Sequence, residues 1–195
     1  MSKFTVGLVA VVLPLSAAAA PETYTFDPFH TYAHFEATHL DFSHLRGRFD
    51  KSTGTFVIDR AAKTASVELT VQTASVTTGM SERGPYKISR DDLLRSPDYF
   101  NAVEFPTMTF KASNVKFAGD FPTRIEGTLT LLGMSKPLTL AVMNARCGTN
   151  SFKKEMCGGN AEAALKRSEF GMKTYLPTVI GDDIKLWIEF EGYKN

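Results

Sequence analysis

The most constraining feature of this sequence is a strict alternation of apolar and polar side chains. Between residues 183 and 191, isoleucine, leucine and phenylalanine occupy every second position, and mostly charged residues stand between them. Successive side chains of a β-strand point to opposite faces of the sheet, so this pattern predicts a strand with one buried face. Residues 66–71 alternate in the same way. Weaker versions of the pattern occur in five further segments: 33–40, 54–59, 107–112, 125–132 and 137–143.

Residues that favour turns separate these predicted strands. They gather at 50–54, 118–120, 133–136 and 181–183. A short helix is predicted to start after Ser89, because the Ser89 side chain can cap it with Asp92 as its partner, and Pro97 ends it early. Residues 168–171 fit one further helical turn. About eight short strands in one domain favour a β-sandwich or a β-barrel, and the 15 phenylalanines slightly favour the larger interior of a barrel.

The first twenty residues have the order of a secretory signal peptide. Lys3 precedes an apolar run over residues 4–15, and small side chains follow over residues 16–20. The apolar run is shorter than the ~20 residues that span a membrane comfortably. We therefore predict that residues 1–20 are removed on export, with cleavage near Ala19 or Ala20, and that residues 21–195 form one soluble domain. An uncleaved membrane anchor is the alternative.

Charge and motif content exclude several classes of function. Without Lys3 the chain carries 21 basic and 21 acidic residues, so it has no general attraction for nucleic acid or for an anionic membrane. No serine lies in a G-x-S-x-G motif, and neither a phosphate loop nor a dinucleotide-binding glycine motif is present. The sequence therefore marks no catalytic residues.

The two cysteines of the chain predict a disulfide. Cys147 and Cys157 would meet an oxidising compartment after export, where a disulfide is the usual state. If residues 138–146 and 160–166 form neighbouring antiparallel strands, a turn near Phe152 brings the two thiols face to face. A redox function would need a C-x-x-C pair or a setting that stabilises a thiolate, so we interpret the bridge as structural.

Four histidines stand close together in the sequence: His30, His34, His39 and His44. On a helix, His30 and His34 could share one face and bind a metal ion. In the predicted strand their neighbours alternate between two faces, so four ligands cannot converge and we expect no metal site. His39 ends the apolar face that includes Ala33, Phe35 and Ala37. It is expected to point inward at the mouth of a barrel, either with a backbone partner or as a polar contact for the head of a ligand.

A charged stretch follows in the middle of the chain. Residues 82–83 and 90–96 are rich in arginine and acidic side chains. Such runs are usually solvated loop surface. The functional alternative is a polar rim in which Arg83 or Arg95 donates hydrogen bonds to an oxygen-rich head group.

A series of short motifs follows in order along the chain. They are Phe26-Asp27 with His30, Phe35, His39-Leu40, and the segments 45–49, 54–56, 74–78, 82–83, 92–100, 105–110, 127–140 and 168–172. In this order and at these spacings, the chain from about Tyr24 to about Tyr193 resembles the YceI-like, polyisoprenoid-binding family of bacterial exported proteins. Two segments depart from that family: residues 84–90 resemble an insertion, and the hairpin with the cysteines lacks a Trp-Gly-Gly-type turn.

The resemblance implies an all-β fold, a lipocalin-like antiparallel β-barrel of about eight strands with one or two short helices. It also implies a periplasmic homodimer whose elongated pore holds an isoprenoid chain, such as a quinone tail or a polyprenyl phosphate, with no cofactor, metal or stable membrane insertion. Each buried CH₂ group contributes about 0.8 kcal/mol, so a long prenyl tail can bind without any catalytic group.

Candidate ligand-binding residues follow from the resemblance and from the alternation that turns every second side chain of a strand toward the inside of the barrel. Those expected to line or close the pore around the tail are Phe35, Ala37, Phe49, Leu94, Phe100, Phe110, Leu129, Leu131 and Phe170. Those expected to meet the head group are His39, Arg83 and Arg95.

Three classes of function remain open at this point. The first is a periplasmic carrier of an isoprenoid lipid, which predicts that lipid copurifies with the protein. The second is a lipid-modifying enzyme on the same barrel with His39 as base, which predicts a chemically altered ligand. The third is an interaction or stress-response module, for example one that delivers quinone to a membrane cytochrome, and a pull-down from membranes distinguishes it from free carriage.

Overall fold

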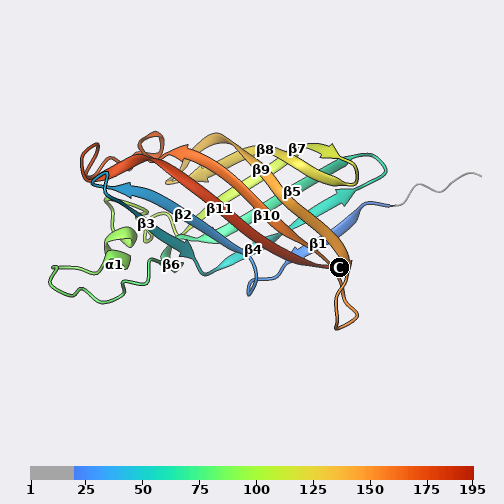
Figure 1. Cartoon of the computed structure of the whole chain (residues 1–195), viewed down its shortest axis with the longest axis horizontal. Coiled ribbons are helices and arrows are strands. Elements are labelled where there is room, and N and C mark those ends of the chain that lie inside the picture. Colours follow the sequence, from blue (N-terminus) through green and yellow to red (C-terminus); the bar gives the residue numbers. More distant parts are fainter. Residues whose placement is uncertain (1–19) are drawn as a thin grey trace, which may run out of the picture.

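The computed structural model describes residues 20–195, so the predicted signal peptide lies almost entirely outside the described residues. The described chain is nearly all β-strand (Figure 1), with one helix, α1 (Arg90–Arg95), and two 3-10 turns, η1 (Thr73–Ser75) and η2 (Arg167–Phe170). Its strands are β1 (Glu22–Phe26), β2 (Tyr32–His39), β3 (Ser43–Phe49), β4 (Ser52–Asp59), β5 (Thr64–Gln72), β6 (Val76–Thr77), β7 (Thr107–Ala118), β8 (Phe121–Leu131), β9 (Met134–Thr149), β10 (Glu155–Lys166) and β11 (Ile180–Lys194).

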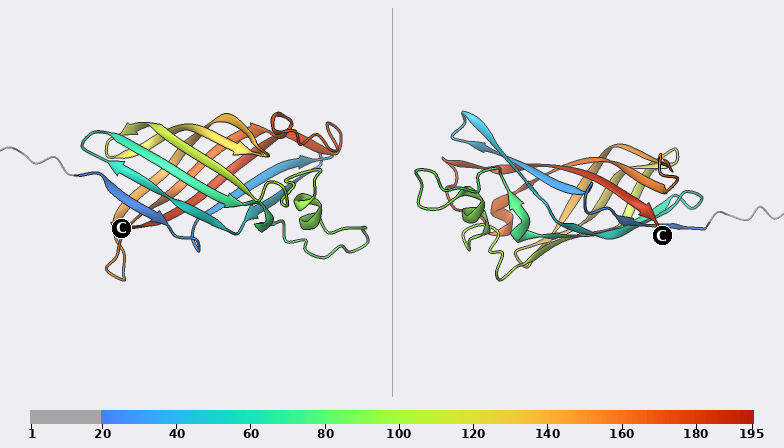
Figure 2. Two further views of the ribbon diagram at one scale, coloured as in Figure 1. Left: turned by 180° about the vertical axis from the view of Figure 1, so that it is seen from behind. Right: turned by 90° about the horizontal axis from the view of Figure 1, so that it is seen from below.

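Eight of these strands close into an antiparallel barrel. The order around it is β1-β4-β5-β7-β8-β9-β10-β11, and β1 pairs with β11 to complete the ring. At the closure Tyr24 lies opposite Lys194 and Phe26 lies opposite Gly192. The closed wall is seen from two further sides in Figure 2. The predicted barrel of about eight strands is confirmed.

Strands β2, β3 and β6 extend the wall at the α1 end of the barrel (Figure 1). They can do so because β11 is long enough for two partners on the same edge. Its C-terminal part pairs with β1, and its earlier part pairs with β2, where Glu189 lies opposite Tyr32. Since β3 then pairs with β6, the barrel is longer on this side, and a hollow inside it can run toward α1.

Several strands extend beyond their predicted limits, because hydrogen bonds to neighbours on both sides hold polar residues in an extended conformation.

The predicted turn at 181–183 is wrong: these residues lie inside β11, where the register with β2 shifts between Ile180 and Ile184. The predicted turn at 50–54 is shorter, since β4 begins at Ser52. Between β8 and β9 only Leu132 and Gly133 turn the chain, both with positive φ, as a tight hairpin with right-handed twist requires.

The predicted helix start is confirmed. The Ser89 hydroxyl oxygen accepts a hydrogen bond from the Asp92 backbone N–H at 3.0 Å, and the same hydroxyl donates to the Asp92 carboxylate at 2.7 Å. This reciprocal cap fixes the first turn of α1, and the helix ends before Ser96 and Pro97. The second predicted turn is η2, after which Gly171 has a φ of 83°.

The predicted disulfide is also confirmed. Cys147 of β9 and Cys157 of β10 are bonded and lie directly opposite each other in the ladder between these strands. The turn that connects the strands includes Phe152 and is closed by hydrogen bonds from the Phe152 and Lys154 N–H groups to the Asn150 side chain. The bridge therefore fixes the register of the β9–β10 hairpin.

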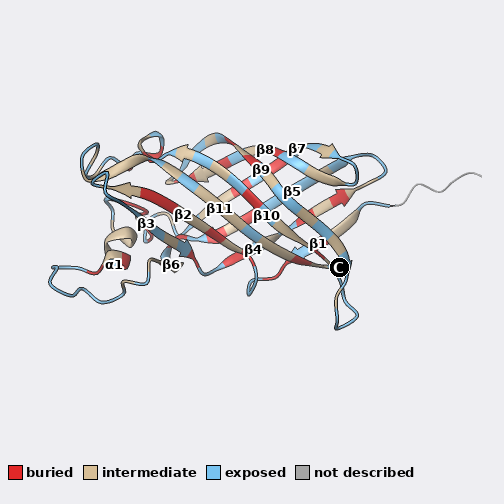
Figure 3. Cartoon of the chain, in the orientation of Figure 1, coloured by how far each residue is buried: buried red, intermediate tan, exposed pale blue. Residues whose placement is uncertain are grey.

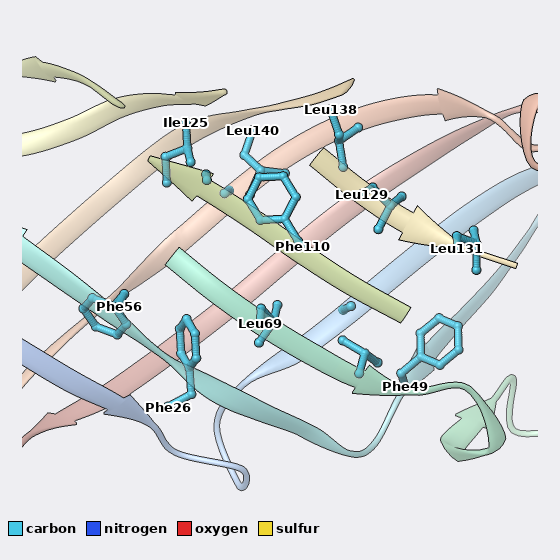
Figure 4. Close-up of a cluster of buried hydrophobic side chains, with 14 of the residues drawn as sticks. Phe26, Phe49, Phe56, Leu69, Phe110, Ile125, Leu129, Leu131, Leu138 and Leu140 are labelled. Carbon is cyan, nitrogen blue, oxygen red and sulfur yellow. The ribbon is translucent and has the colours of Figure 1, made fainter. Parts of the chain in front are cut away.

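The core of the molecule is the inner face of the barrel. Figure 3 shows buried positions along the strands and exposed positions in the hairpins and in the long loop before α1. Side chains from opposite walls, among them Phe56, Phe110 and Phe49, gather in the interior (Figure 4). Among residues 20–195, no helix is long and apolar enough to cross a membrane.

Candidate functional site

The barrel encloses an elongated apolar cavity of about 200 Å³. That volume is more than ten times the roughly 10–15 Å³ that one buried water needs. Leu94 of α1 and Met172 line it at one end, and the bonded Cys147 and Cys157 line it at the other, so it runs along most of the barrel. Its walls are almost entirely apolar atoms. The aromatic side chains of the core therefore leave a hollow lined by apolar atoms.

Most of the residues predicted to surround a lipid tail line this cavity. They are Phe35, Ala37, Phe49, Leu94, Phe100, Phe110, Leu129 and Leu131. Phe170 is also buried, at 2 % exposure, but it packs in the core beside the cavity without lining it. Their part in binding a ligand remains a prediction, and the geometry places eight of the nine where such a ligand would lie.

Three of these rings form a cluster toward the α1 end. The Phe35 ring lies 5.8 Å from that of Phe49 and 6.3 Å from that of Phe100, and the last two rings are 5.0 Å apart. Tilted and edge-on ring pairs with centroids about 4.5–7 Å apart are favourable beyond the surface area that they bury. The cluster therefore gives the cavity a firm aromatic wall.

The residues predicted to meet a head group are not brought together. Arg95 donates to the carbonyl oxygens of Ala74 at 2.9 Å and Val76 at 2.8 Å, and it pairs with Asp92 at 2.9 Å. These bonds hold α1 against the chain around β6. Arg83 is exposed in the loop before α1.

His39 is not among the residues that line the cavity, although Ile180, its partner across the ladder with β11, is one of them. It is the last residue of β2 and lies opposite Ser43 and Ile180. The head-group function predicted for His39 gains no support from this placement.

Two buried polar residues that the sequence did not single out line the cavity. Arg167, 3 % exposed, donates to the carbonyl oxygens of Gly181, Met172, Thr174 and Ile180, each at 2.9 Å. Tyr99 is also buried, and the Arg167 guanidinium carbon lies 6.0 Å from the centre of its ring. Burial lowers the pKa of Arg167 and raises the pKa of Tyr99, because it disfavours the charged form of each.

In the sequence, Arg167 stands beside Lys166 and Ser168 and resembles an ordinary surface arginine. The only available signal was its place just before the motif at 168–172. Burial of an arginine at the end of a strand depends on the loop that folds over it. This loop, residues 171–179, lies outside the strands, so alternation of apolar and polar residues could not predict its position.

The four histidines do not converge. His30 Nδ1 lies 2.8 Å from an Asp27 carboxylate oxygen and 3.9 Å from one of Glu191, and the hydrogen bond to Asp27 raises the pKa of His30. His34 instead bonds Glu189 at 2.8 Å. Within the described part of the chain, Asp27, His30 and Glu191 are the one group whose ligand atoms lie close enough to share a metal ion.

The comparisons with known proteins agree with this geometry. The YceI-like domain family matches residues 24–192 of the chain. The chain belongs to the YceI-like family. Its sequence is 34 % identical over 199 aligned positions to protein YceI of Escherichia coli O17:K52:H18, and the alignment covers both chains completely. The matched segment lies within the predicted domain at 21–195.

Solved structures share the barrel of this YceI-like chain. The Campylobacter jejuni YCEI protein superposes with a TM-score of 0.63 at 28 % identity, covering 81 % of this chain and 90 % of that one. A polyisoprenoid binding domain from Saccharophagus degradans, implicated in plant cell wall breakdown, superposes with a TM-score of 0.63 at 16 % identity, covering 88 % and 98 %. At that low identity, the second similarity shows the fold alone.

Proposed function

We propose that this YceI-like protein is a periplasmic carrier that holds a long-chain isoprenoid lipid inside its barrel. The observation that carries the proposal is the elongated apolar cavity of about 200 Å³. A prenyl tail matches it in shape and chemistry, and each buried CH₂ group contributes about 0.8 kcal/mol. The name of the Saccharophagus degradans relative, a polyisoprenoid binding domain, supports the same ligand class.

The proposed ligand is of the quinone or polyprenyl phosphate type, and binding rather than catalysis is the proposed activity. The signal-like segment at 1–20 and the Cys147–Cys157 disulfide support a periplasmic location, since a disulfide persists in an oxidising compartment. A homodimer and a quinone-linked membrane partner, such as a cytochrome, belong to the same proposal.

Native mass spectrometry of the protein purified from its own source tests the proposal. We expect a bound species whose extracted mass and fragmentation identify an isoprenoid lipid. Repeated recovery of an empty barrel, together with no uptake of added quinone or polyprenyl phosphate, would contradict it. Prolonged incubation separates carriage from catalysis, because a carrier releases its lipid chemically unchanged, whereas an enzyme acting on the head group does not.

A further inference from the structure

Arg167 is an unusual residue in the wall of an apolar cavity. Its side chain is 3 % exposed and comes from η2, at the α1 end of the barrel. Moving a cation out of water carries a large free-energy cost unless it is paired or fully hydrogen-bonded. A cation is therefore kept at this position by a specific set of partners, or for a ligand.

The partners inside the protein are neutral dipoles. The guanidinium group donates four hydrogen bonds to backbone carbonyls between residues 172 and 181. No carboxylate forms an ion pair with it among residues 20–195. Asp182 attracts it from a distance, but that carboxylate accepts hydrogen bonds from the N–H and hydroxyl of Ser168. The carbonyls hold the guanidinium in place and leave much of its charge without a counter-charge.

One donor of the group also remains free. A guanidinium has five N–H bonds. Nε donates one, Nη2 donates two and Nη1 donates one, to Met172, so the second N–H of Nη1 has no acceptor within the described chain. Arg167, Met172 and Tyr99 all line the cavity. The Tyr99 hydroxyl, for which no hydrogen bond occurs in the described chain, adds a second donor group at this end.

We propose that Arg167, with Tyr99 beside it, is the site at which the cavity binds the anionic oxygen of a lipid head group, which selects isoprenoid phosphates over the corresponding alcohols. This inference rests on the proposed carrier function and assigns the head group to the α1 end. A phosphate oxygen would supply both the missing acceptor and the missing counter-charge. Hydrogen bonds between charged partners are about twice as strong as neutral ones, and a low-dielectric cavity strengthens them further.

Farnesyl phosphate and farnesol provide matched probes, because they share one tail and differ only in the head. Calorimetric titration of the wild-type protein is expected to show at least tenfold tighter binding of farnesyl phosphate. Equal affinities would overturn the head-group assignment and leave the carrier function intact. Failure of both probes to bind, together with an empty barrel in native mass spectra, would contradict the carrier function itself.

Variants of Arg167 and Arg95 test which residue causes the preference for farnesyl phosphate over farnesol. Arg167→Met is expected to lower the affinity for farnesyl phosphate at least tenfold and to change that for farnesol less than threefold, while Arg167→Lys retains part of the preference. Arg95→Met is the matched comparison, since Arg95 also holds backbone carbonyls but lies outside the cavity lining. Loss of the preference in Arg95→Met, with retention in Arg167→Met, would overturn the proposal.

A measurement on the wild-type protein keeps the proposal testable if Arg167→Met does not fold. The second pKa of a free phosphate monoester is about 6. Phosphorus NMR of bound farnesyl phosphate across pH should show a second pKa clearly below that of the free compound, because a neighbouring guanidinium favours the dianion. An unchanged or raised pKa would overturn the assignment, and a structural function of Arg167 alone would not produce the decrease.

Discussion

Phe35 contributes both to the packing of the barrel and to the wall of its cavity. Its ring contacts Phe49 and Phe100, and it faces the hollow in which we place the lipid tail. Across the β2–β3 ladder it lies opposite Gly47, where a Cβ atom would collide with the Phe35 ring. The small residue in β3 thus leaves the space that this ring occupies.

Phe35→Asp is expected to abolish lipid uptake, because it places a carboxylate among apolar walls that offer it no partner. Native mass spectrometry after incubation with a prenyl lipid measures the bound fraction. Phe152→Asp is the matched control, since Phe152 is 81 % exposed in the β9–β10 turn and should leave uptake unchanged. Full uptake by a folded Phe35→Asp protein would mean that the tail lies elsewhere.

Gly54 occupies a backbone conformation that other residues rarely adopt. Its φ is +143°, and a Cβ atom built there would collide with the carbonyl oxygen of Glu68 on β5. We expect Gly54→Ala to lower the free energy of unfolding by about 1–3 kcal/mol, the usual range for such backbone strain. Urea unfolding measures it. Gly148→Ala, with open space around the new methyl group, should change stability little, and equal effects of the two would refute the explanation.

At the scale of the elements, the closure of the barrel depends on a short strand. β1 has only five residues, and its first residue, Glu22, links it to two other parts of the wall. The Glu22 carboxylate accepts from Lys194 of β11 at 2.9 Å and forms an ion pair with Arg60, just after β4. The hydrogen bond from Lys194, with a smaller contribution from Arg60, lowers the pKa of Glu22 to about 2 against the opposing effect of burial.

This pKa predicts a loss of stability in acid. Glu22 titrates ordinarily near 4.5 and at about 2 in the folded chain, so its stabilisation is complete above pH 4.5 and disappears as the pH falls toward 2. We expect the free energy of unfolding of the wild type to fall over this range by on the order of 1 kcal/mol more than that of Glu22→Gln, after allowance for solvent screening. Urea unfolding at about pH 5 and about pH 2.5 measures the difference, and parallel losses would contradict it.

The β9–β10 hairpin depends in part on its disulfide. Cys147 and Cys157 are ten residues apart, and a bridge that closes so short a loop contributes about 2–4 kcal/mol, largely by restricting the unfolded chain. Replacing both cysteines by serine should lower the free energy of unfolding by that amount in oxidising buffer. With a strong reductant, the wild type should lose a similar amount and the variant should not change. A variant as stable as the oxidised wild type would show that the ladder alone fixes the hairpin.

At the scale of the whole molecule, the length of the cavity should limit the length of the lipid. Ala161 of β10 is 2 % exposed and lines the hollow, with Ile188 and Val142 as its neighbours on the adjacent strands. A ring at this position would divide the cavity. We expect Ala161→Phe to retain short prenols and to exclude long ones.

Uptake of prenols of graded length, measured by native mass spectrometry, tests this limit. Ala164→Phe is the control, because Ala164 is exposed on the outer face of the same strand. If Ala161→Phe accepted the same lengths as the wild type, the tail would not pass this point, and the proposed binding mode would have to be revised.

The β-class, the helix cap at Ser89 and the disulfide could be predicted from local patterns, and most of the cavity lining from alternation together with the family resemblance. Alternation fixes which side chains share a face, so Phe110, Leu129 and Leu131 were assigned inward correctly. Alternation does not say where along a strand the cavity ends, so it could not predict that His39 is absent from the lining. Arg95 and Arg167 are both arginines near turns, and only the fold shows that one lies in the cavity wall.

The sequence by itself determined the period of the strands, the positions of most turns and the family, since these follow from neighbouring residues and their order. The tertiary structure alone decided that β1 closes on β11, that a hollow remains inside and that Arg167 faces it. Such features arise from side chains far apart in the chain, whose combined volumes and charges decide whether an interior is filled or left open.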